Sequence, residues 1–113
     1  IRFGANHCAE DEKDLSKMTM DLEMFAAYTR GYMEACPTLT DKEVEMMPMG
    51  ALLMTLECGL RFLTDYIDGD HYFRIAYPEH NLDRAHTQMK LVYDMEQKWE
   101  EMQKIVAEEA AKR

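Results

Sequence analysis

Hydrophobic residues recur along this chain mainly at steps of three and four, and alternating runs of Val, Ile and Thr are scarce. Steps of three and four are typical of helices with one buried face, whereas alternating runs would be needed to build a sheet. The pattern predicts helices over 21–36, 49–67 and 82–113, and a shorter one within 38–47. The polar first 18 residues predict one or two helical turns at most. The sequence therefore indicates an all-α domain of about four helices.

Local signals mark where these helices begin. Thr40 is followed three residues later by Glu43, the spacing of a capping box that opens a short helix. Pro48 suits the first turn of the helix that follows, because its missing N–H has no partner there.

Other signals mark the connection between the two longest helices. The Asp-Gly-Asp turn at 68–70 predicts the end of the helix over 49–67, and 71–80 is mixed enough to be a loop or one extended piece. Asn81 is a suitable N-cap for the last helix.

The helix over 49–67 carries few charges among many apolar residues. On a helical wheel one arc of it is predicted to be the core face: Leu52, Leu53, Leu56, Leu60, Leu63 and Ile67. Glu57, Arg61 and Asp65 repeat at four-residue steps on a separate, narrow arc. This polar seam is unusual on a helix that is apolar over most of its circumference.

Two interpretations of the seam stay open. It is an exposed strip of ion pairs, each contributing about 0.2–0.5 kcal/mol, or it lines a ligand cleft. In the second case Arg61 presents its planar donors to oxygen-rich groups, and Glu57 and Asp65 hold it in place. The polar residues at 68–72 favour the cleft, because binding groups often sit on loops that follow a rigid element.

One carboxylate of the last predicted helix falls on its apolar stripe. Glu96 lies between Val92, Tyr93 and Trp99. If buried there, it should be hydrogen-bonded or paired, because an unpaired buried charge costs several kcal/mol. A structural partner is the favoured interpretation.

Composition limits the class of protein. A chain of 113 residues can form a single domain, and its formal net charge of −9 argues against non-specific nucleic-acid binding. No apolar run approaches the roughly 20 residues that span a bilayer, so we expect no membrane partner. Three widely spaced cysteines are typical of free thiols in the cytoplasm.

Motifs for self-contained catalysis were not found. The four histidines, His7, His71, His80 and His86, do not have the spacing of a zinc site, and no phosphate-binding glycine loop or nucleophile elbow is present. We therefore expect no catalytic residue, metal or cofactor within this chain alone.

Three blocks of sequence together resemble a known family. They are "IRFGAN" with "EDEKDLSK", "LECGLRFLTDYIDGDHYF", and "HNLDRAHTQMKLVYDME". They are similar to the carboxy-terminal part of aminoglycoside phosphotransferase and choline kinase-like enzymes, and within these to the N-acetylhexosamine 1-kinase branch.

The resemblance implies a two-lobed, protein-kinase-like parent that transfers the γ-phosphoryl group of ATP, with Mg²⁺, to a small sugar. The catalytic-loop aspartate and the magnesium-binding aspartate of that family would precede Ile1. Residues 1–113 would then be a single helical domain of the C-terminal lobe, a fragment that binds substrate without being catalytic alone.

The resemblance also implies site residues. Arg61 and Tyr72 match positions that contact the sugar in this branch. Asp65 is added on geometry, because one turn beyond Arg61 it could orient the guanidinium or accept a sugar hydroxyl. Arg2 and Asn6, near the active-site edge of the family, are secondary candidates.

A function of another class stays open. The chain could be a freestanding acidic helical module that dimerises or docks a partner protein. In either case the 11 methionines and the aromatic residues predict an exposed hydrophobic patch that favours self-association, and we expect a homodimer.

Overall fold

The computed structural model describes all residues from 1 to 113 and is entirely helical, which confirms the predicted all-α class. It contains one 3₁₀ turn, η1, and five α-helices, of which α2 has only five residues. Their bounds are η1 Leu15–Lys17, α1 Leu22–Ala35, α2 Asp41–Glu45, α3 Met47–Asp68, α4 His80–Gln97 and α5 Trp99–Ala110. None of these helices is both long enough and apolar enough to cross a lipid bilayer.

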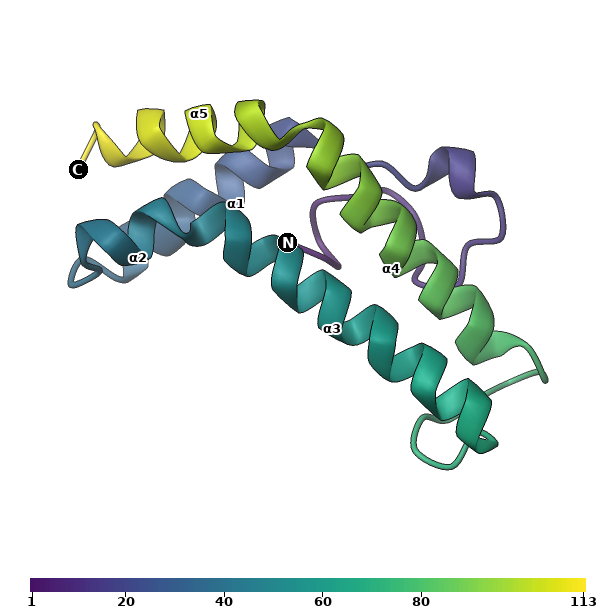
Figure 1. Ribbon diagram of the computed structural model, residues 1–113. Coiled ribbons are helices and arrows are strands. Elements are labelled where there is room, and N and C mark those ends of the chain that lie inside the picture. The colour runs from purple at the N-terminus through teal and green to yellow at the C-terminus, as the bar shows by residue number, and fades with distance from the viewer.

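The helices form an elongated molecule of 47 × 27 × 19 Å (Figure 1). α3 and α4 lie side by side as a hairpin, and the loop that joins them is at one end. α5 continues from α4 after a bend and packs against α1 and α2 at the other end.

The predicted helix ends are largely confirmed. Asp21 caps α1 by accepting hydrogen bonds from the backbone N–H groups of the first turn. Thr40 and Glu43 form the predicted capping box at α2. Gly69 ends α3 in the left-handed region, with φ of 100°, a conformation that glycine adopts without the steric cost of a Cβ atom.

The predicted core face of α3 is wrong. The buried residues are Pro48, Thr55, Gly59, Phe62 and Asp65. Three of the leucine-face residues are instead half or more exposed, namely Leu53 (52%), Leu60 (50%) and Ile67 (75%), and the other three are partly buried.

The reason lies in how closely α3 and α4 approach each other. A Cβ atom added at Gly59 would lie 3.1 Å from Cβ of Gln88 and 2.5 Å from Cε of Met89. Small residues therefore occupy the contact between the two helices, and the larger leucines are turned toward its edges and the solvent.

The last predicted helix is divided into two. The chain bends at Lys98, which has φ of −105° and ψ of 16°, so that α5 turns back onto α1 and α2. The side chain of Lys98 donates to the backbone carbonyl of Met20 and to Asp94, both at 2.7 Å. Glu96, which the sequence made a candidate for a buried charge, is exposed and needs no structural partner.

Asn81 does not cap this helix as predicted. α4 begins at His80, two residues before the predicted start at 82, and its N-terminus has no side-chain cap. Asn81 instead lies inside the first turn and is fully buried.

The buried apolar cluster lies toward the α1, α2 and α5 end of the molecule. Four of its eight residues are methionines: Ala5, Met20, Phe25, Met33, Val44, Met95, Met102 and Val106. The loop end of the α3–α4 hairpin contributes no residue to this cluster, so polar contacts contribute more to holding that end in place.

Candidate functional site

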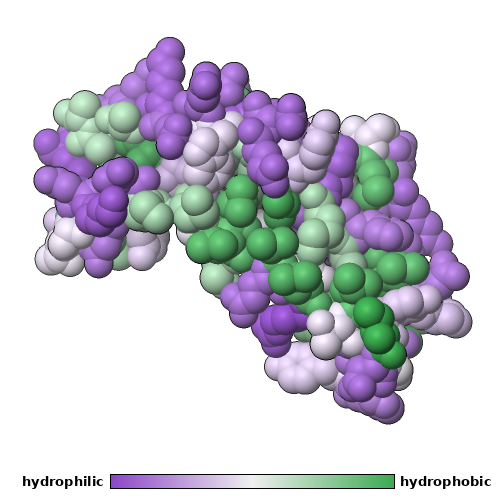
Figure 2. Space-filling view, viewed as in Figure 1, coloured by the Kyte–Doolittle hydropathy of each residue, from purple (hydrophilic) through white to green (hydrophobic).

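A cavity of about 620 Å³ runs along α3 and reaches the loop that follows it. We call it the α3 groove. It is lined by apolar and polar residues together: Leu53, Leu56, Glu57, Leu60, Arg61, Thr64, Asp65, Asp68, Tyr72 and Phe73. Figure 2 shows hydrophobic residues gathered in a band over α3, with hydrophilic ones beside them. The polar seam predicted from sequence therefore lines a cavity.

Arg61 projects into this groove without an ion-pair partner. Its Cζ atom lies 5.3 Å from the centre of the Tyr72 ring and 5.5 Å from that of Phe73. No salt bridge joins it to Glu57 or Asp65, so the ladder of ion pairs along the seam is not formed. The guanidinium is held by aromatic faces, and its N–H donors stay available.

Tyr72 is the outermost member of a short aromatic series. Phe62 is buried on α3, and the centre of its ring lies 4.6 Å from that of Phe73. Phe73 in turn meets Tyr72 edge-on at 4.9 Å. Tyr72 itself is 73% exposed, so its ring and hydroxyl can reach a ligand in the groove.

Asp65 is buried, and its two carboxylate oxygens hold the loop. Oδ1 accepts hydrogen bonds from the backbone N–H groups of His71 (2.9 Å) and Tyr72 (2.8 Å). Oδ2 accepts from the N–H of Phe73 (3.0 Å) and from the side-chain amide of Asn81 (2.7 Å). All four hydrogen bonds to this carboxylate are donated by groups of the chain itself.

This environment changes the acidity of Asp65. Burial is the largest single influence and raises its pKa, but the three backbone hydrogen bonds and the one from Asn81 together outweigh it. The pKa of Asp65 is therefore below its ordinary value, and the carboxylate stays ionised at neutral pH. Asp65 lies beside the groove, and its carboxylate holds the loop that carries Tyr72.

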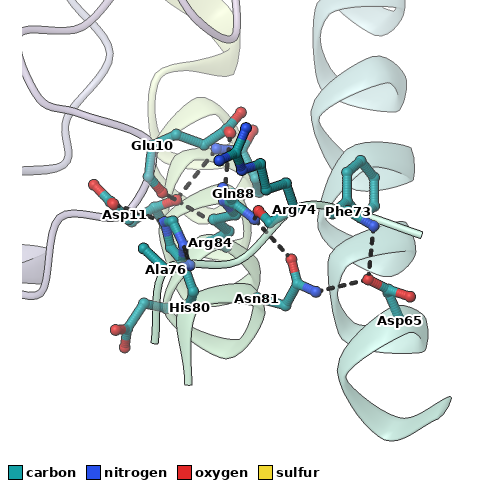
Figure 3. A network of polar contacts seen from close by, with 12 residues as sticks. Glu10, Asp11, Asp65, Phe73, Arg74, Ala76, His80, Asn81, Arg84 and Gln88 are labelled. Atoms are coloured by element: carbon teal, nitrogen blue, oxygen red, sulfur yellow. Dashed lines mark hydrogen bonds and ion pairs between the residues drawn. The ribbon is translucent and has the colours of Figure 1, made fainter. Parts of the chain in front are cut away.

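The residues that support Asp65 from α4 were not predicted from the sequence. Asn81 donates to Asp65 and also to Asp70 (3.0 Å), and its own carbonyl oxygen accepts from Arg84 (3.0 Å). Arg84 donates as well to the backbone carbonyl of Arg74 (3.1 Å), as Figure 3 shows. The only sequence signal was a polar residue at the start of α4, and it was assigned to a cap.

The secondary candidates Arg2 and Asn6 lie elsewhere. Arg2 pairs with Glu10 at 2.5 Å and donates weakly to Gln88 on α4 (3.4 Å). The Asn6 amide donates to the backbone carbonyl of Arg2 (2.9 Å). Neither residue lines the α3 groove.

The histidines also do not converge. No group of three or more His, Cys, Asp or Glu side chains has the geometry to hold a metal ion. His80 is used structurally: its Nδ1 accepts from the backbone N–H of Ala76 (3.0 Å), and its Nε2 lies 2.8 Å from Asp11. Because Nδ1 accepts this hydrogen bond, the proton of the neutral imidazole lies on Nε2, which faces Asp11.

The groove thus combines a planar cation, an exposed aromatic ring and carboxylates in one cavity. This set can bind a polar ligand with an apolar face, and it contains no group activated as a nucleophile. No protein-family model matches this sequence.

Proposed function

We propose that the α3 groove binds a small sugar of the N-acetylhexosamine type. The chain would form the substrate-binding part of an ATP-dependent phosphotransferase. The observation that carries this proposal is the unpaired Arg61 guanidinium, stacked on the exposed Tyr72 ring inside a cavity. The sequence blocks that resemble sugar kinases include both residues.

The chemistry of the groove suits such a ligand. An aromatic ring can pack against the C–H face of a pyranose, and a guanidinium can donate two parallel hydrogen bonds to a carbonyl or to neighbouring hydroxyls. Glu57 and Asp68, which line the same cavity, can accept from sugar hydroxyls. The cavity volume lies within the range of about 300–1,000 Å³ that is usual for small-molecule sites.

In the proposed reaction this chain orients the acceptor sugar. The catalytic aspartate that accepts the hydroxyl proton and the groups that hold ATP and Mg²⁺ would come from outside these 113 residues. Phosphoryl transfer depends mainly on positioning and on charge stabilisation, so a part that only positions the acceptor still contributes to rate. A cytoplasmic enzyme of this kind would keep Cys8, Cys36 and Cys58 reduced, and all three are unpaired.

Calorimetric titration of the protein as its gene encodes it, with N-acetylglucosamine and N-acetylgalactosamine, tests the proposal. Arg61→Ala should weaken binding about tenfold, the loss expected for a charge-assisted hydrogen bond of about 1.4 kcal/mol. Arg74→Ala is the matched control, because that side chain is exposed and lies outside the groove. Equal affinity of the Arg61→Ala variant and the wild type would refute the proposed site.

A second function is favoured by the exposed apolar residues. Leu53, Met54, Leu60 and Ile67 are at least half exposed along α3, as are Phe3, Tyr28, Tyr32, Tyr72 and Tyr93 elsewhere. Such surface is typical of a dimerisation or docking module. Light scattering with size exclusion would support that function if the protein is a dimer at micromolar concentration and Arg61→Ala leaves sugar titrations unchanged. A monomer that binds sugar would contradict it.

A further inference from the structure

We propose that Asn81 is a positioning residue for the sugar site, although it does not line the groove. This inference rests on the proposed function for its ligand. Its structural part concerns the loop at 69–73 and can be tested without one.

Asn81 lies between three charged groups. Its amide nitrogen donates to Asp65 (2.7 Å) and to Asp70 (3.0 Å), and its carbonyl oxygen accepts from Arg84 (3.0 Å). The carboxylates can only accept and the guanidinium can only donate, so the amide has one possible orientation. Asn81 itself is fully buried.

Asp65 alone does not fix the loop to α4. Asp65 belongs to α3 and holds the N–H groups of residues 71–73. Asn81 ties this carboxylate to α4 and fastens the loop again at Asp70. Arg84 adds a third attachment, at the carbonyl of Arg74 (Figure 3). The chain on both sides of residues 71–73 is therefore held within one turn of α4.

The support from α4 also fixes the residues that face the ligand. Tyr72 is exposed, and its ring is placed by its backbone, whose N–H is bound to Asp65. Arg61 lies over the rings of Tyr72 and Phe73, so a shift of the loop moves both walls of the groove. Non-glycine Asp70 has φ of 63°, a conformation that the hydrogen bond from Asn81 helps to hold.

Asn81→Asp provides the test, because it keeps the shape and places a carboxylate against Asp65 and Asp70. Hydrogen exchange of the amides of residues 71–73, measured by NMR, should become at least tenfold faster, and core amides of α1 and α5 should keep their rates. Gln88→Glu is the matched control: it makes the same chemical change at a buried position of α4 that does not contact the loop. Arg84→Gln is the milder variant if Asn81→Asp does not fold, and it should accelerate the same amides to a smaller extent.

Acid pH supplies a second readout. The introduced carboxyl would face Asp65, Asp70 and Arg84, and when protonated it can again donate to Asp65. The protection of the loop in Asn81→Asp should therefore recover on acidification, whereas a loss of core packing would not recover in this residue-specific way.

Sugar titration completes the test. Asn81→Asp should bind N-acetylglucosamine or N-acetylgalactosamine about tenfold more weakly than the wild type, and Gln88→Glu should bind it equally. Unchanged loop exchange in Asn81→Asp, or faster exchange with unchanged sugar affinity, would overturn the inference. If the wild type binds neither sugar, the proposed function fails, and the exchange data alone decide whether Asn81 holds the loop.

Discussion

The close contact between α3 and α4 leads to a prediction about two glycines of the same helix. Gly50 and Gly59 both lie within α3, and alanine normally stabilises a helix by roughly 0.5–1 kcal/mol relative to glycine. A Cβ atom at Gly50 would meet no other atom within 4 Å. Gly50→Ala should therefore stabilise the protein by this amount.

Gly59→Ala should have the opposite effect. Its Cβ would lie 2.5 Å from the flexible end of Met89, which can move, but also 3.1 Å from Cβ of Gln88, which is fixed to the α4 backbone. Overpacking of this kind costs about 1–3 kcal/mol. After subtraction of the helix-propensity gain, the variant should be less stable than the wild type by up to about 2 kcal/mol.

Urea unfolding, followed by far-UV circular dichroism and by fluorescence of Trp99, measures both variants. Trp99 is the only tryptophan and packs against the buried cluster, so it reports on the core. The midpoints of the two variants should differ by roughly 1 M, since small proteins lose about 1–3 kcal/mol per molar urea. Equal stabilisation by Gly50→Ala and Gly59→Ala would refute the close approach of α3 and α4.

Three further predictions concern single side chains. The pKa of Glu109 is lowered from 4.5 to about 2, mainly because Glu109 accepts hydrogen bonds from Arg30 in an ion pair. The stabilisation that this ion pair gives the fold is therefore fully present above pH 4.5 and is lost as the pH falls toward 2. Glu109→Gln should lower the melting temperature at neutral pH and flatten its decline in acid. The pKa of Tyr77 is raised to about 12, chiefly because its hydroxyl donates to Asp83, and this stabilisation is lost as pH rises from about 10 toward 12. Ultraviolet titration should show one late tyrosine, and Asp83→Asn should return it toward the ordinary value. Thr40→Ala should cost about 1 kcal/mol in urea unfolding, because it removes a helix cap.

The sequence predicted those features of the fold that depend on neighbouring residues. The capping box at Thr40, the proline in the first turn of α3 and the end of that helix at the Asp-Gly-Asp turn all involve contacts within a few positions. Such contacts form in the same way whatever packs around them, and the spacing of residues is enough to identify them.

The features that depend on a distant partner were not predicted. A helical wheel assigns the largest apolar residues to the core, but α3 approaches α4 at Gly59, where even a Cβ atom would crowd Gln88 and Met89. The bend at Lys98 likewise depends on contacts with Met20, 78 residues earlier in the chain. Neither contact leaves a local signal.

The candidate site divides in the same way. The seam on α3 and the polar loop after it indicated a cleft, and the cavity at Arg61 and Tyr72 lies there. The support from Asn81 could not be predicted, because a buried asparagine at the start of a helix has the same sequence signal as a cap.

The uneven distribution of the core has a consequence for how long the groove keeps its shape. The methionine-rich cluster lies at one end of the molecule, and the loop at 69–73 lies at the other and is fastened by ionised and amide groups. Local opening of the loop at 69–73 should therefore respond to salt and acidity more than to temperature. A bound sugar would then suppress that motion and, because the helices unfold as one unit, would also raise the resistance of the distant end to unfolding.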